Sequence, residues 1–65
     1  MSSISEAGEL LSKIKDSIEY SSAKRHRSAL LEIYRKSKKS DVPYIREYVK
    51  EANAIIDEMK KGNST

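Results

Sequence analysis

The clearest helical pattern in this chain runs from Ser40 to Gly62 and reads SDVPYIREYVKEANAIIDEMKKG. Ser40 and Asp41 can cap a helix, and Pro43 suits the first turn, where its missing N–H has no partner to lose. Gly62 follows two lysines and is a typical helix terminator. These signals predict a helix over about residues 42–61.

Apolar residues recur inside this segment at three- and four-residue steps, as on one face of a helix. They are Ile45, Tyr48, Val49, Ala52, Ile55, Ile56 and Met59. A stripe of this width can contact two neighbouring helices, which indicates a three-helix arrangement.

Two narrower stripes precede this segment and predict helices over about residues 4–20 and 22–39. The first stripe consists of Ile4, Ala7, Leu11, Ile14 and Ile18. The second consists of Ala23, His26, Leu30, Ile33, Tyr34 and Ser37. With only two glycines and one proline in the chain, helix is favoured nearly everywhere and strands are not expected.

The two narrower stripes are out of phase with each other. On one uninterrupted helix they would lie about 100° apart. We therefore expect a break near Tyr20, Ser21 and Ser22, with one of the serines capping the second helix. The fold class is then all-α, a small three-helix bundle. The alternative is a single long helix from about Glu9 to Ser40 in an intertwined dimer.

Length and composition limit the class of protein. The 65 residues allow one domain, which we place at residues 1–61, with a disordered tail at 62–65. A chain of this size buries only about 60% of its unfolded surface, which allows a weak homo-oligomer through the first or middle helix.

The absence of cysteine fits a reducing compartment, and we expect a cytoplasmic location. The longest apolar runs have three residues, so we expect no insertion into a membrane. No apolar segment follows Met1, so we expect no secretory signal.

Positive charge is concentrated in the middle of the chain. Seven of the 13 Lys and Arg residues lie in the segment from Lys24 to Lys39, where Glu32 is the single acid. The formal charge of this segment is therefore 7 − 1 = +6, whereas the net charge of the whole chain is +3. On the predicted middle helix, a second stripe flanks the buried one at spacings of three, four, four and three. It consists of Lys24, Arg27, Leu31, Arg35 and Lys38. These five residues are the candidate partner-binding site.

Four cations around one leucine suit an anionic and partly apolar partner. A protein with an acidic or amphipathic surface would place an apolar residue on Leu31 and carboxylates on the cations. We therefore expect a protein–protein interaction adaptor or regulator. The alternative is a nucleic-acid-binding module that contacts phosphates through the same basic face. A third alternative is an assembly subunit whose basic stripe meets the acidic face of another copy.

A purely structural interpretation of the same stripe also exists. In it, the face is solvated, the alkyl stems of the cations cover the edge of the core, and Leu31 completes that core.

The sequence shows no arrangement typical of catalysis or metal binding. His26 is the single histidine, and a nucleophilic or metal site normally needs a second group held against it. The carboxylates lie beside lysines, as in local ion pairs on helix surfaces. We expect no enzyme, no catalytic residue, no cofactor and no metal, with His26 packed at the edge of the core.

Tyr34 and Tyr48 fall on buried stripes, whereas Tyr20 and Tyr44 are candidate contact residues.

Overall fold

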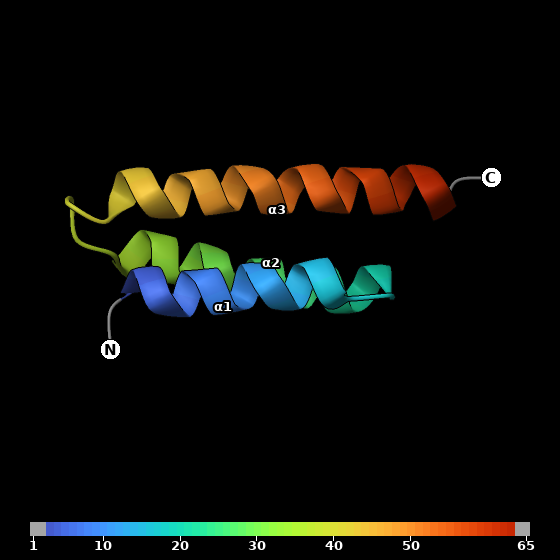
Figure 1. Ribbon diagram of the computed structural model, residues 1–65, viewed down its shortest axis with the longest axis horizontal. Helices are drawn as coiled ribbons and strands as arrows, with labels where there is room; N and C mark the ends of the chain where they lie inside the picture. Colours follow the sequence, from blue (N-terminus) through green and yellow to red (C-terminus); the bar gives the residue numbers. More distant parts are fainter. Residues whose placement is uncertain (1–2, 64–65) are drawn as a thin grey trace.

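The structure, a computed structural model that describes residues 3–63, contains three helices joined by two short connections. Helix α1 spans Ser3–Asp16, α2 spans Tyr20–Lys36 and α3 spans Val42–Asn63. Helices α1 and α3 run in the same direction, and α2 runs in the opposite direction (Figure 1). Each helix contacts both others, and no strand occurs among the described residues. The predicted all-α three-helix bundle is confirmed.

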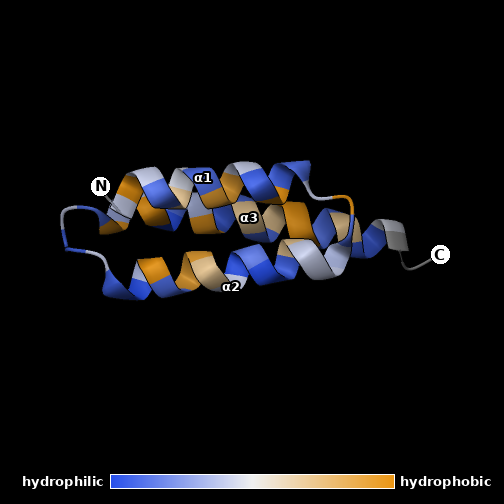
Figure 2. Cartoon of the chain, turned by 90° about the horizontal axis from the view of Figure 1, so that it is seen from below, coloured by the Kyte–Doolittle hydropathy of each residue, from blue (hydrophilic) through white to orange (hydrophobic). Residues whose placement is uncertain are grey.

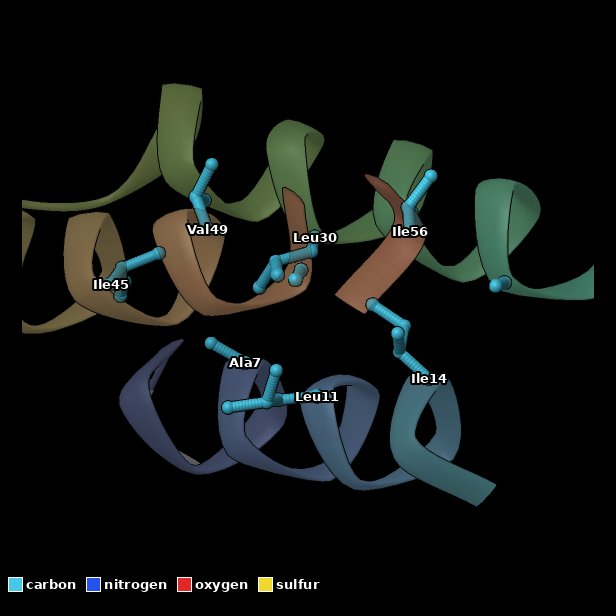
Figure 3. Packing of buried hydrophobic residues seen from close by; sticks show 9 residues of the cluster. Ala7, Leu11, Ile14, Leu30, Ile45, Val49 and Ile56 are labelled. Atoms are coloured by element: carbon cyan, nitrogen blue, oxygen red, sulfur yellow. The ribbon is translucent and has the colours of Figure 1, made fainter. Parts of the chain in front are cut away.

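One core cluster receives side chains from all three helices (Figure 3). Its nine buried members are Ala7, Leu11, Ile14, Ala23, Leu30, Ile45, Val49, Ala52 and Ile56. All nine lie on the apolar stripes that the sequence predicts. Each helix contributes one alanine, whose small side chain lets larger residues of the facing helices fill the space. Among residues 3–62, no polar or charged residue is buried.

The first connection differs from the prediction. Helix α1 ends at Asp16, and α2 already begins at Tyr20, so the break lies at residues 17–19 and not at 20–22. Ile18, expected in the buried stripe, is 95% exposed. The N-cap of α2 is Glu19, with an extended backbone and no capping bond from its side chain. The predicted serine cap is therefore wrong, and so is the single long helix.

A hydroxyl group explains why α1 ends early. The Ser17 Oγ donates a hydrogen bond of 2.7 Å to the carbonyl of Lys13, and the Ser17 N–H donates to the carbonyl of Ile14. Carbonyls in the last turn of a helix lack helical partners, so these two bonds close the end of α1. Sequence periodicity does not report such a side-chain bond to the backbone.

The second connection is also longer than expected, because α2 ends at Lys36 and not at Lys39. The Ser37 Oγ donates to the carbonyl of Tyr34 at 2.7 Å, and the backbone of Ser37 is extended. Helix α3 begins as predicted: the carbonyl of Asp41 accepts the N–H of Ile45 at 3.0 Å, the first helical bond.

The end of α3 lies slightly beyond the prediction. The helix reaches Asn63 and includes Gly62, which was expected to terminate it. A shift of one or two residues at a helix end is common and changes no packing. Residues 64 and 65 of the predicted tail lie outside the described residues.

Hydrophobic and hydrophilic segments alternate along each helix, as expected for amphipathic helices (Figure 2). None of the helices within residues 3–63 combines the length and the hydropathy that a membrane span requires.

Candidate interaction surface

Four of the five predicted site residues lie on one side of α2. Lys24, Arg27, Leu31 and Arg35 follow one another at spacings of three, four and four within the helix. The side chains of Lys24 and Arg35 are exposed, whereas Leu31 is half-buried and packs against the core. Leu31 therefore belongs partly to the core and offers only the rest of its side chain to a partner.

Lys38 does not join this stripe. Because α2 ends at Lys36, Lys38 lies in the connection to α3, where its carbonyl accepts the N–H groups of Asp41 and Val42. Its side chain is exposed. Together with Lys36 and Lys39, it places cations near the C-terminus of α2, where the helix dipole favours positive charge.

Arg27 connects the stripe to α3. Its Nη1 donates a hydrogen bond of 3.2 Å to Oδ1 of Asn53. Its Nε is covered by neighbouring atoms and forms no hydrogen bond. The Arg27 side chain thus takes part in the α2–α3 contact, and Arg27 supports the fold as well as the charge of this face.

Helix α3 adds two cations that the sequence analysis missed. Arg46 and Lys50 precede Asn53 by seven and three residues, spacings that place all three on one side of α3. Since Asn53 meets Arg27 and the two helices are antiparallel, Lys50 lies near the level of Leu31 and Arg46 near that of Arg35. The helical spacing of Arg46 and Lys50 indicates that they share one side of α3. Only the contact between α2 and α3 shows that this side adjoins the cationic stripe of α2.

We call this surface the basic face. It consists of Lys24, Arg27, Leu31, Arg35, Arg46 and Lys50.

Three exposed cations of the basic face, Lys24, Arg35 and Lys50, are only weakly engaged within the molecule. Arg35 lies 3.5 Å from Glu32, and Lys50 lies 4.0 Å from Glu47. Both pairs are more than half exposed, and exposed pairs of this kind contribute about 0–1 kcal/mol. The Lys24 Nζ stands 5.3 Å from the centre of the Tyr20 ring. A partner can therefore replace these contacts at small cost.

The tyrosines and the histidine are placed mostly as expected. Tyr34 and Tyr48 are half-buried and pack against the core, as predicted, and Tyr44 is 60% exposed at the start of α3. Tyr20 differs: it is half-buried and packs against the core, so it offers less contact surface than expected. His26 is half-buried on α2, in agreement with a place at the edge of the core.

No pocket forms among residues 3–63, and the same residues contain no group of three side chains that could hold a metal ion. Comparison of this chain with protein families, curated proteins and solved structures finds no match.

Proposed function

We propose that this chain is a small, non-enzymatic protein-binding module, an adaptor or regulator that uses its basic face. The observation that carries this proposal is a partly exposed leucine, Leu31, between cations that come from two helices. Cations alone attract any anion, but an apolar side chain among them favours a partner with an apolar group at the same place.

The partner fitting this surface is an acidic amphipathic segment of another protein. Its apolar side chain would contact Leu31, and its carboxylates would contact the cations on either side, Arg35 and Arg46 among them. Such charge complementarity raises the rate of association and selects the partner. An amphipathic helix presents this pattern along one face. The absence of cysteine supports a cytoplasmic setting for the module.

The second candidate function is binding of nucleic acid through phosphates. It is favoured by the two cations that α3 adds, because they bring the number on the basic face to five. If all five cations contacted phosphates, raising the salt concentration from 50 to 200 mM would weaken binding about 500-fold. A protein partner that contacts Leu31 would lose less, because burial of an apolar side chain does not depend on counterion release.

A pair of charge-reversed variants tests the protein-binding proposal. Arg35→Glu with Arg46→Glu reverses two exposed cations of the basic face. Lys13→Glu with Lys61→Glu reverses two exposed cations elsewhere, on α1 and at the end of α3. Both variants change the net charge by the same amount, from +3 to 3 − 4 = −1. Far-ultraviolet circular dichroism establishes that each variant remains helical.

The assay is site-specific photo-crosslinking in a nuclease-treated lysate, with the crosslinker at position 28 of α2, beside Leu31. We expect the wild type and the Lys13/Lys61 control to crosslink the same protein and the Arg35/Arg46 variant to lose it. If nuclease removes every crosslinked product, the nucleic-acid candidate replaces the proposal. If both variants lose the product equally, net charge and not the basic face controls binding, and the proposal fails.

A further inference from the structure

The connection between α1 and α2 presents an exposed isoleucine between two carboxylates. Ile18 is 95% exposed, and Asp16 and Glu19 are exposed on either side of it. Figure 2 shows the hydrophobic segment of this connection in orange. Among the described residues, neither carboxylate takes part in a hydrogen bond or an ion pair.

The fold explains Glu19, which is the N-cap of α2, where the helix dipole favours negative charge, but it does not explain Asp16 and Ile18. Asp16 is the last residue of α1, where the helix dipole disfavours negative charge. Its neighbour Lys15 does not neutralise it, because the Lys15 Nζ lies 3.6 Å from Glu51 on α3. A turn residue such as Asn or Ser would serve the connection as well as Ile18 does. The acidic and apolar groups together are the complement of a surface that is basic and partly apolar.

The same molecule carries such a surface in its basic face, where Leu31 lies between cations. We propose that the α1–α2 connection of one copy docks on the basic face of a second copy, with Ile18 against Leu31. Asp16 and Glu19 then contact the surrounding cations. This inference rests on the proposed function, because it uses the same face, and it identifies the chain itself as one protein that this face binds.

The contact forms between molecules and not within one. Leu31 lies eleven residues beyond Tyr20, about 16 Å along α2 from the connection, and the rigid helix between them keeps Ile18 away from the Leu31 of its own chain. The interface joins two different surfaces, so it is heterologous and leaves one free surface of each kind at the ends of a dimer. A connection of three residues covers little area, and we expect weak association, below the strength of a standard interface.

Two complementary variants test the interface. The connection variant carries Asp16→Asn, Ile18→Ser and Glu19→Gln, and the face variant carries Arg35→Gln and Arg46→Gln. Their net charges are 3 + 2 = +5 and 3 − 2 = +1, so no general attraction between opposite charges can join them. All five positions are exposed, and circular dichroism establishes that both variants keep the fold.

Sedimentation velocity at millimolar protein concentration gives the readout. We expect the wild type to self-associate and each variant alone to be monomeric. An equimolar mixture should form a one-to-one complex, because the intact connection of the face variant meets the intact face of the connection variant. Ile18→Ser alone should weaken self-association about tenfold to hundredfold. Tyr44→Ser, which removes a large exposed hydrophobic side chain outside both the basic face and the α1–α2 connection, should leave it unchanged.

Three results would overturn the inference: a monomeric wild type, a mixture that stays monomeric, or equal losses for Ile18→Ser and Tyr44→Ser. A symmetric contact between two connections or between two basic faces would instead let one variant self-associate on its own, because that variant keeps the surface involved, and this result would contradict the inference as well. The proposed function fails separately. If the connection variant still crosslinks the external protein partner and the mixture stays monomeric, the proposed function stands and the self-association does not.

Discussion

Ile18 and Ile45 allow a direct test of where the first helix ends. Sequence periodicity places both isoleucines on buried stripes, but the structure leaves Ile18 95% exposed and Ile45 fully buried. Replacing either one by alanine removes the same atoms. Ile45→Ala creates a cavity in the core, whereas Ile18→Ala only shortens a side chain that water already surrounds.

The expected magnitudes differ enough to decide the question. Truncating a buried isoleucine to alanine costs about 2–5 kcal/mol, and a domain of this size has a total stability of roughly 3–10 kcal/mol. Ile45→Ala therefore removes a large part of the stability. Ile18→Ala should change the free energy of unfolding by less than about 0.5 kcal/mol, as is usual for surface positions.

A milder variant keeps the comparison measurable if Ile45→Ala does not fold. Ile45→Val should cost about 0.5–1.5 kcal/mol. Since 1 kcal/mol shifts the melting temperature of a small domain by about 4–8 °C, the expected decrease is about 2–12 °C.

The assay is urea denaturation followed by circular dichroism at micromolar protein concentration, where the weak self-association proposed above does not contribute. The slope of the transition should stay constant, so that midpoints report stability. Equal losses for Ile18→Ala and Ile45→Ala would refute the reasoning. They would mean that α1 continues through Ile18 and buries it, as the periodicity alone predicts.

Three further predictions concern local contacts. Gly8→Ala should stabilise the protein by up to about 1 kcal/mol, because Gly8 lies inside α1 and a Cβ there would meet nothing within 4 Å; a lower melting temperature would contradict this. Ser17→Ala should cost about 0.5–1.5 kcal/mol in urea denaturation, because it removes the hydroxyl bond to the carbonyl of Lys13, and Ser17→Thr should retain most of it. A double-mutant cycle with Arg27→Met and Asn53→Ala should give a coupling free energy of about 0.5–1.5 kcal/mol, and additive losses would show that the bond between Arg27 and Asn53 contributes nothing.

The sequence predicts part of the basic face and misses the rest for a physical reason. Lys24, Arg27, Leu31 and Arg35 could be grouped because helical periodicity alone places them on one side of α2. The prediction that Lys38 belongs to the same helix is wrong, because α2 ends at Lys36, where the Ser37 hydroxyl bonds to a backbone carbonyl. Side-chain bonds to the backbone at helix ends are not visible in a hydrophobic pattern.

Arg46 and Lys50 show the other limit. Their spacing places them on one side of α3, but nothing in that spacing says which side of α2 they approach. The hydrogen bond between Arg27 and Asn53 answers this question, and its position depends on how the core residues of both helices pack. The sequence could therefore predict that Arg46 and Lys50 form a stripe on α3, but not that this stripe belongs to the basic face.

The helices and the nine core residues follow from sequence, because an apolar stripe must be buried and its period reveals the helix that carries it. These are local properties of one segment at a time. The exposure of Ile18 follows from the early end of α1, which the bond from the Ser17 hydroxyl to a backbone carbonyl closes. The junction of the two cationic stripes comes from the packing of α3 on α2. Packing of side chains selects one register among several that the stripes allow, and the register of α2 against α3 places Lys50 near the level of Leu31 and Arg46 near that of Arg35.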